Sequence, residues 1–243
     1  MRQTAEIRGC RPEDRDEIYT YRLTGQVVLT VGVEEGWADP TDPRKVDFRK
    51  RPSFMGPIEF DNAGKPLNPH RTDYMLGDRG ALLGKWGPNN AADSVVFTKP
   101  TAIAERKVLL IRRSDGSHQW AVPGGMVNPG EQVSAAASRE LREEANIDLS
   151  KMESKLIYEG YVDDPRNTRN SWMETTARMF ELDYTPQPRA GTDAIDARWF
   201  DCSDVESLIR ATQEYDVSLG LEPQPLYADH HLLVGRGLLM LAA

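Results

Sequence analysis

Residues 125–147 read GMVNPGEQVSAAASRELREEANI, and this stretch decides how the rest of the chain is interpreted. The run Glu131–Ala145 contains neither proline nor glycine, which predicts a helix. At about 100° per residue, Glu140, Glu143 and Glu144 fall within one arc of about 100° on that helix. The sequence therefore predicts a helix with a single acidic edge.

The apolar side of the predicted helix overlaps the acidic edge. The residues of this apolar side are Val133, Ala137, Leu141 and Ala145. The carboxylates are therefore expected at the margin of the buried face, beside a cleft. Like charges at this spacing destabilise an isolated helix by roughly a few tenths of a kcal/mol per pair, and such a local penalty is often found at a functional site. Clustered oxygen ligands without sulfur or imidazole favour Mg²⁺ or Mn²⁺.

The segment before the helix is rich in turn-forming residues. Pro123-Gly124-Gly125 supplies a flexible backbone with exposed amides and carbonyls, and Asn128-Pro129-Gly130 reads as a turn. This turn is expected to deliver Glu131 into the first helical turn, where a carboxylate complements the helix dipole. Eight residues along a straight helix span about 12 Å, so Arg139 can pair with Glu131 only if the loop folds back.

A glutamate-rich helix with interleaved arginines is, by itself, usually a solvated face. The complete spacing is more specific: Gly125-x5-Glu131-x7-Arg139-Glu140-Leu141-x-Glu143-Glu144-x-Asn146-Ile147. It resembles the box of the Nudix hydrolases, Gly-x5-Glu-x7-Arg-Glu-apolar-x-Glu-Glu-x-Gly-apolar. The departure is Asn146, where the box has glycine. Asparagine is second only to glycine in its tolerance of the left-handed conformation, so it can still form the C-cap of the helix.

The order of elements around the box is mixed. Residues 1–86 are rich in proline and contain one strand-like run, Val27–Val33, so we expect a small N-terminal cap domain there. Residues 87–243 alternate strand and helix candidates, which indicates an α/β or α+β layered fold. The expected elements are strands at Ser94–Lys99, Lys107–Arg113, Leu156–Val162, Trp172–Leu182 and Ala197–Phe200 and helices at Asp204–Thr212 and Asp229–Ala243. The resemblance implies a Nudix α/β/α sandwich for this second domain.

Further segments narrow the resemblance to one branch of the family. They include Trp37–Pro40, Pro66–Pro69, Gly80–Asp93, Gly160–Thr168, Ser171–Thr175 and Pro225–Asp229 with the histidine that follows. These segments are similar to ADP-ribose pyrophosphatases of the mitochondrial type. They are equally similar to the cytosolic C-terminal domain of melastatin-type, ADP-ribose-gated cation channels. The resemblance implies ADP-ribose bound in the cleft between the two domains.

The resemblance also implies Mg²⁺-dependent hydrolysis of ADP-ribose to AMP and ribose 5-phosphate, with Mn²⁺ as an alternative cofactor. The implied catalytic residues are Arg139, Glu140, Glu143 and Glu144. The implied metal ligands are Glu140, Glu143, Glu144 and the carbonyl of Gly124. The implied substrate contacts are Asp164, Arg166, Tyr227 and Asp229. Without the resemblance, Asp164 and Arg166 would be interpreted as part of an ordinary turn and Tyr227 as a packing aromatic.

Composition limits the remaining alternatives. The chain has 243 residues, 30 Lys plus Arg and 38 Asp plus Glu, a net charge of −8 that argues against a nucleic-acid binder. An anionic substrate would therefore need a cation. The two cysteines are far apart in sequence and no apolar run approaches the ~20 residues of a membrane span, so we expect no membrane insertion and a cytoplasmic location.

Two other functions remain open. The chain could be an ADP-ribose-binding sensor domain, hydrolytically active or inert, whose partner is the rest of a channel polypeptide. It could also be a Nudix enzyme for another nucleoside diphosphate, which a substrate panel would test.

Overall fold

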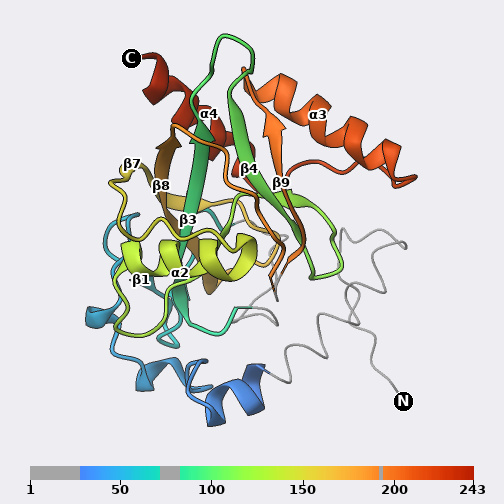
Figure 1. Ribbon diagram of the computed structural model, residues 1–243. Helices are drawn as coiled ribbons and strands as arrows, with labels where there is room; N and C mark the ends of the chain where they lie inside the picture. Colours follow the sequence, from blue (N-terminus) through green and yellow to red (C-terminus); the bar gives the residue numbers. More distant parts are fainter. Residues whose placement is uncertain (1–27, 72–82, 192–193) are drawn as a thin grey trace. The chain divides into compact units, whose positions relative to one another are not determined.

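The computed structural model describes residues 28–71, 83–191 and 194–243, and its contacts divide the chain into two compact units (Figure 1). The first unit contains the residues up to Asn89 together with Asp163–Glu174. The second contains Asn90–Val162 and Thr175–Ala243. Nothing in the composition of Asp163–Glu174 indicates that it groups with the N-terminal part of the chain. The domain boundary expected between residues 86 and 87 stays a prediction.

The second unit is built on a mixed sheet. Its strand order is β5-β4-β3-β8-β7, with β6 paired to β3 and β9 paired to β4 (Figure 1). The strands are β3 (Gly87–Thr98), β4 (Lys107–Arg113), β5 (Trp120–Ala121), β6 (Gly124–Met126), β7 (Lys155–Val162), β8 (Ser171–Leu182) and β9 (Ala194–Asp201). The β4 and β9 strands are antiparallel, with Leu109 opposite Trp199. Both β3 and β8 begin in the first unit and continue into this sheet.

Helices cover both faces of this sheet. The helices are α2 (Val133–Ala145), α3 (Val205–Ser218) and α4 (His230–Ala242). Val96 belongs to a core cluster with Leu141 of α2, whereas its neighbour Phe97 belongs to another cluster with Leu208 of α3 and Leu233 of α4. Successive residues of a strand point to opposite faces, so α2 covers one face and α3 and α4 cover the other. This is the α/β/α sandwich expected from the sequence.

The elements expected in residues 87–243 are present, and most extend beyond the expected ends. Lys107–Arg113 forms β4 with the predicted bounds, whereas β3 begins seven residues before the expected Ser94. Helix α3 begins after Asp204 and continues to Ser218. The Asp204 side chain accepts a hydrogen bond from the Ser207 amide. No described helix is both long and apolar enough to cross a membrane.

The start of α2 differs from the sequence prediction. Gln132 is the N-cap and the helix begins at Val133, so Glu131 lies before the helix and not in its first turn. The physical reason is the turn itself: the Glu131 amide donates to the Asn128 carbonyl at 3.0 Å, which keeps Glu131 in the loop. The helix ends as expected, with Asn146 left-handed at φ 55° and ψ 37°.

The first unit consists of short elements. They are the π-helical turn Val28–Gly32, the 3₁₀ turns Pro43–Lys45 and Phe48–Lys50, and the paired strands β1 (Glu59–Phe60) and β2 (Pro66–Leu67). The prediction of a strand at Val27–Val33 is wrong for residues 28–33, which are helical. Val27 lies outside the described residues. The backbone here bonds locally, since the Glu35 amide donates to the Val31 carbonyl at 2.8 Å.

Buried charges organise the interior of the first unit. The carboxylate of Glu174 is fully buried and accepts bonds from Ser53 Oγ, the Phe54 amide and Trp172 Nε1 at 2.6–2.7 Å. Three donors satisfy a carboxylate that would otherwise be costly to bury. The indole of Trp172 is itself buried, as expected for a core residue.

A buried ion pair holds α3 to the sheet in the second unit. Arg112 of β4 pairs with Asp216 of α3, and Trp120 Nε1 donates to the same carboxylate at 3.0 Å. The guanidinium also lies over the Trp120 ring at 4.9 Å from its centroid. Within the described residues, Arg112 Nε and Asp216 Oδ2 lack hydrogen-bond partners. The pair is therefore incompletely satisfied.

We expect Asp216→Ala to lower the free energy of unfolding by about 3 kcal/mol or more, because removing one partner leaves a buried charge uncompensated. Urea unfolding measures this change. The double variant Arg112→Met with Asp216→Leu removes both charges and should lose less stability than the single variant. If Asp216→Ala costs under about 1 kcal/mol, the pair does not hold α3 in place.

Candidate functional site

The acidic edge of α2 lies at the border between the core and the surface. Glu144 is 7% exposed, the Glu140 side chain is 12% exposed and the Glu143 side chain is 41% exposed. The apolar side chains of α2 pack on the sheet beside them, with Leu141 fully buried. The three carboxylates therefore form a graded series from the interior to the surface, at the margin that helix geometry predicts.

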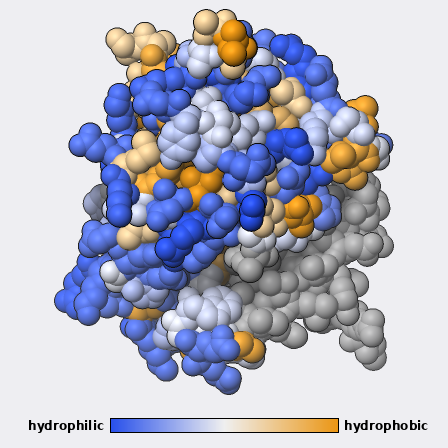
Figure 2. Space-filling view, in the orientation of Figure 1, coloured by the Kyte–Doolittle hydropathy of each residue, from blue (hydrophilic) through white to orange (hydrophobic). Residues whose placement is uncertain are grey.

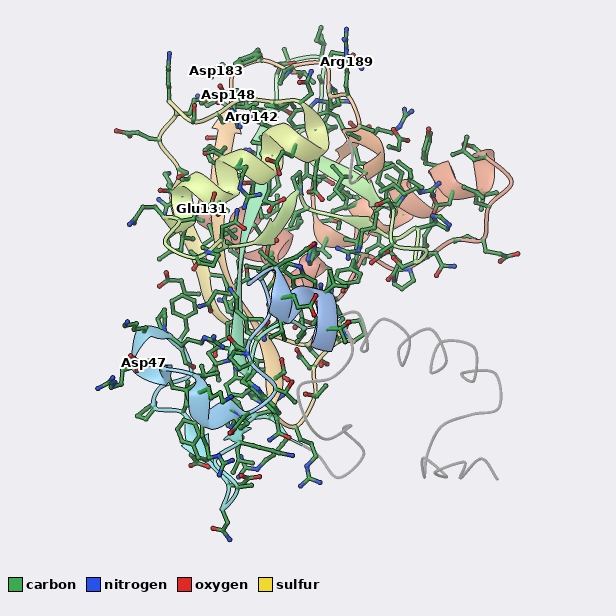
Figure 3. All side chains as sticks on the ribbon, turned by 90° about the horizontal axis from the view of Figure 1, so that it is seen from below. Asp47, Glu131, Arg142, Asp148, Asp183 and Arg189 are labelled. Carbon is green, nitrogen blue, oxygen red and sulfur yellow. The ribbon has the colours of Figure 1, made fainter. Side chains whose placement is uncertain are left out.

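Arg139 connects this edge to the loop before α2. Its Nε and Nη2 donate to the two oxygens of Glu131 at 2.8 and 2.9 Å. Its Nη1 donates to Glu140 at 2.6 Å and to Glu143 at 3.1 Å. A further bond reaches the Met126 carbonyl at 3.0 Å. The loop does fold back, as this pairing requires, and Figure 3 shows Glu131 beside the start of α2.

Charge pairing dominates the electrostatics of this loop. The bonds from Arg139 lower the pKa of the Glu131 carboxyl to about 2, with the Asn128 amide contributing a further bond. The same contacts raise the pKa of the Arg139 guanidinium, with Glu131 as the main cause. Glu131 is therefore ionised throughout the neutral range and serves as an anchor for Arg139.

Two glycines bring the backbone of β6 against these carboxylates. Gly124 pairs with Asp93 of β3, and its amide donates to Glu144 Oε2 at 2.9 Å. A Cβ on Gly125 would lie 2.4 Å from the carboxylate carbon of Glu140, and a Cβ on Gly124 would lie 2.0 Å from Asp93 Oδ1. Both positions need glycine because the backbone and the carboxylates approach so closely.

Asp93 is a site residue that reasoning from the sequence missed. It is 6% exposed and accepts a 2.6 Å bond from Thr175 Oγ1 of β8, while its other oxygen lies against Gly124. In the sequence it stands within a strand of mostly small and apolar residues, where nothing marks it as part of an acidic site.

The buried carboxyl of Glu144 is held in an unfavourable environment for its charge. Its pKa is raised to about 8, mainly by burial and also by the neighbouring Glu140 and Asp93, while the Gly124 amide and Arg113 act in the opposite direction. A cation in this region would reverse that balance by stabilising the ionised form.

The donor set fits a hard divalent cation by its chemistry. All the side-chain donors around Gly124 are carboxylate oxygens, the ligands that Mg²⁺ and Mn²⁺ prefer. In the described parts of the chain, however, no three His, Cys, Asp or Glu side chains are gathered closely enough to hold a metal ion. Arg139 instead holds two of the three glutamates of α2.

The segment before α4 contacts the chain just upstream of the glycines. The Tyr227 amide donates to the Trp120 carbonyl at 2.9 Å, and the Val122 amide donates to His230 Nδ1 at 3.0 Å. The Arg113 guanidinium lies 3.9 Å from the centroid of the buried Tyr227 ring. Asp229 is the N-cap of α4. Tyr227 is therefore connected by its backbone to β5, two residues before the segment that leads to Gly124.

Asp164 and Arg166 belong to the first unit and pair with each other. Arg166 Nε and Nη2 donate to the two oxygens of Asp164, both at 2.8 Å, and the Arg166 amide donates to Oδ1 at 2.8 Å. The Asp164 side chain is 3% exposed and the Arg166 side chain 25%. Asp164 thus fixes the orientation of a guanidinium that remains partly exposed.

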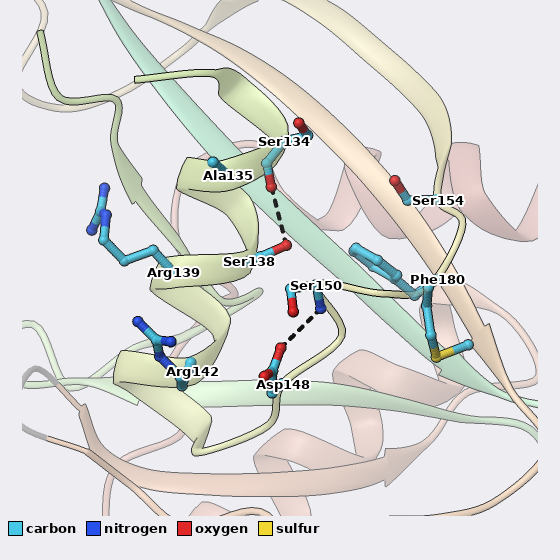
Figure 4. Close-up of a pocket in the computed structure, with 10 residues that line it drawn as sticks. Ser134, Ala135, Ser138, Arg139, Arg142, Asp148, Ser150, Ser154 and Phe180 are labelled. Atoms are coloured by element: carbon cyan, nitrogen blue, oxygen red, sulfur yellow. Dashed lines mark hydrogen bonds between the residues drawn. The ribbon is translucent and has the colours of Figure 1, made fainter. Parts of the chain in front are cut away.

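A polar pocket of about 350 Å³ lies on another side of α2, between the helix and the loop that follows it (Figure 4). Ser134, Ser138 and Arg142 line it, and they lie about 120–200° around the helix from Glu140. Figure 2 shows mainly hydrophilic residues over the outward side of α2. This pocket does not include the carboxylates next to Gly124.

Comparisons with known proteins agree with this geometry. A family model described as the NUDIX domain matches residues 89–219. The chain is 39% identical to "ADP-ribose pyrophosphatase, mitochondrial" of Rattus norvegicus, over 74% of this chain and 62% of the relative. It thus spans less than two thirds of that relative's length. It is 43% identical to "Transient receptor potential cation channel subfamily M member-like 2" of Nematostella vectensis, over 56% of this chain and 10% of the channel.

A solved structure supports the fold. The crystal structure of a MutT/nudix family protein from Enterococcus faecalis aligns with a TM-score of 0.50 and 21% identity. The alignment covers 64% of this chain and 62% of that one.

We expect the stability of the metal-free protein to depend on Glu144. Its pKa is raised from 4.5 to about 8 on folding, so the folded chain binds the extra proton between these values. The stabilisation is fully present below about pH 4.5 and is lost as the pH rises through about 8. Urea unfolding from pH 5 to 8.5 in EDTA should show this decline, and Glu144→Gln should flatten it.

The control for this profile is Glu214→Gln, which removes an exposed carboxylate on α3. It should reproduce the pH dependence of the unmodified protein. If Glu144→Gln and the unmodified protein show the same pH dependence of stability, Glu144 is not the cause of that dependence.

Proposed function

The chain belongs to the Nudix family, and we propose that it hydrolyses ADP-ribose to AMP and ribose 5-phosphate. The observation that carries this proposal is the set of three α2 carboxylates beside the Gly124-Gly125 backbone. Arg139 holds Glu140 and Glu143, and the Gly124 amide holds Glu144. The name of the rat relative supports ADP-ribose as the substrate. The finer assignments below belong to the same proposal.

Nudix hydrolases generally use divalent metals, and we propose Mg²⁺ here, with Mn²⁺ as an alternative. Its ligands would be Glu140, Glu144, Glu143 and the carbonyl oxygen of Gly124. When bound, the cation neutralises the pyrophosphate and polarises its phosphoryl oxygens. The donor chemistry and the raised pKa of Glu144 support this choice, because an acidic protein needs a positive charge to bind an anionic substrate.

The protein's own residues have separate roles in this proposal. Arg139 restrains Glu140 and Glu143 and ties both to the loop through Glu131. Glu144 is aligned by the Gly124 amide. Glu143 is the most exposed of the three glutamates of α2, so it is the one best placed to orient an attacking water and accept its proton.

Four residues are proposed to contact the substrate. Arg166, oriented by Asp164, donates to phosphate or ribose oxygens, since a guanidinium offers paired donors. Asp164 accepts from ribose hydroxyls. Tyr227 and Asp229 serve the terminal ribose or the adenine. The support for Tyr227 is its backbone bond to β5, and the support for Asp229 is its place two residues later, at the start of α4.

A second candidate function is an ADP-ribose-binding sensor domain attached to a cation channel. The observation that favours it is the 43% identity to the Nematostella vectensis channel protein. An active domain within a channel polypeptide satisfies both proposals, since hydrolysis and binding use the same carboxylates.

The cytoplasmic location expected from the sequence is also part of the proposal. The rat relative is named a mitochondrial protein, so fractionation with cytosolic and mitochondrial markers is the deciding measurement.

We expect AMP and ribose 5-phosphate when the protein is incubated with ADP-ribose and Mg²⁺, as measured by chromatography. Glu143→Gln and Glu144→Gln should each lower kcat by about 10² or more, because each removes a group that acts on the water or the cation. Glu214→Gln is the matched control and should retain full activity.

Binding separates the two candidate functions. Calorimetry with ADP-ribose should show that Glu143→Gln still binds. Binding by the unmodified protein without any AMP formation at micromolar enzyme would reject the hydrolase and favour the sensor. Turnover of other nucleoside diphosphates at similar kcat/KM would reject the assignment of ADP-ribose as the substrate.

We expect Arg166→Ala to raise the KM for ADP-ribose by about 10-fold or more, with a smaller effect on kcat, because a charge-assisted bond is worth about 1.5–3 kcal/mol. Steady-state kinetics measure both constants. Arg169→Ala is the matched control, since Arg169 is an exposed arginine of the same loop. Equal KM values for the two variants would remove Arg166 from the substrate contacts.

A further inference from the structure

The glycine loop of the acidic site is a direct continuation of β5. Only Val122 and Pro123 separate the end of this strand, Ala121, from Gly124. Proline has no amide hydrogen, so Val122 carries the last backbone donor before Gly124. Whatever accepts this donor helps to set the position of the Gly124 backbone.

The acceptor is a side chain from the far end of the sequence. The Val122 amide donates to Nδ1 of His230 at 3.0 Å, across 108 residues of chain. The His230 residue is 8% exposed and Val122 is 1% exposed, so solvent has little access to this bond. A buried amide that loses its acceptor is destabilising, so the backbone would shift to recover a partner.

His230 is itself held rigidly. Its amide donates to the Tyr227 carbonyl at 3.1 Å, and the Tyr227 amide donates to the Trp120 carbonyl at 2.9 Å. The rings of Tyr227 and His230 meet edge to face, with centroids 5.6 Å apart and planes at 88°. The turn before α4 and the β5 segment are thus joined by two hydrogen bonds, one at Tyr227 and one at His230.

The turn that presents His230 is strained. Ala228 has φ 44°, in the left-handed region that is unfavourable for a residue with a Cβ. Such a conformation persists only where surrounding contacts determine it. Here the contacts of Tyr227 and His230 with the β5 segment do so.

We propose that His230 is a positioning residue of the hydrolytic site. Its Nδ1 fixes the Val122 amide and thereby the placement of the Gly124 amide against Glu144. This inference rests on the proposed hydrolase function.

The proposal makes a specific demand on the side chain at position 230. The acceptor must lie where Nδ1 lies, one bond beyond Cγ. The Oδ1 atom of asparagine occupies this place, whereas the Oε1 atom of glutamine lies one carbon farther out, where Nε2 of the histidine would be. Asparagine should therefore preserve the bond to Val122 and glutamine should not.

The experiment compares His230→Asn, His230→Gln and His230→Ala in the full chain. With ADP-ribose and Mg²⁺, we expect kcat for His230→Asn within about threefold of the unmodified protein. For His230→Gln and His230→Ala we expect kcat to fall by about 10–100-fold, because misplacement by about 1 Å can cost 10²-fold. KM should change less than kcat.

Two further readouts separate positioning from general stability. Melting temperatures show whether the Asn and Gln variants are equally folded. The Val122 and Gly124 amide resonances should stay in place in His230→Asn and move in His230→Gln, with faster exchange of the Val122 amide. Equal kcat for the Asn and Gln variants at equal melting temperature would overturn the proposal.

The amide resonances also distinguish this inference from the proposed function. If the unmodified protein forms no AMP, the hydrolase proposal fails and kcat carries no information. Movement of Gly124 in His230→Gln but not in His230→Asn would then still support the positioning role. An unmoved Gly124 resonance in both variants would overturn it.

Discussion

The acidic site depends on one guanidinium. Arg139 bonds to Glu131, Glu140 and Glu143, and these three carboxylates would otherwise repel one another. Without it, the i,i+3 and i,i+4 glutamate pairs of α2 would destabilise the helix and the loop before it would have no anchor. The spacing of the sequence motif follows from this constraint. One arginine can reach a loop carboxylate and two helix carboxylates only when they stand at fixed distances along the chain.

Glu144 is the carboxylate that Arg139 does not hold, and it is also the most buried. The Gly124 amide is its hydrogen-bond donor, and Glu140 and Asp93 oppose its ionisation. The fold has thus placed negative groups around a glycine backbone that leaves no room for a Cβ. In the proposed metal-bound form, a divalent cation would offset the repulsion that disfavours the ionised form of Glu144.

The sequence predicts the local part of this architecture well. Strand β4 and the left-handed C-cap at Asn146 follow from short-range patterns, because a short continuous apolar run and the tolerance of asparagine for the left-handed conformation are local properties of the sequence. The helical turn at Val28–Gly32 could not be predicted in this way. Its β-branched residues suit a strand, but the backbone bonds locally, and that choice depends on tertiary contacts.

The site shows the same division between local and distant information. The grouping of Glu140, Glu143 and Glu144 is predicted from their spacing. Residues three and four apart share one face of a helix, whatever the rest of the fold. Asp93 and His230 are not predicted in this way, since they reach this segment from β3 and from the first residue of α4. Each lies far in sequence from the helix that carries the glutamates, so the spacing of the motif does not record them. Residues that position a backbone segment become visible only when the hydrogen bond of each buried amide is traced to its acceptor.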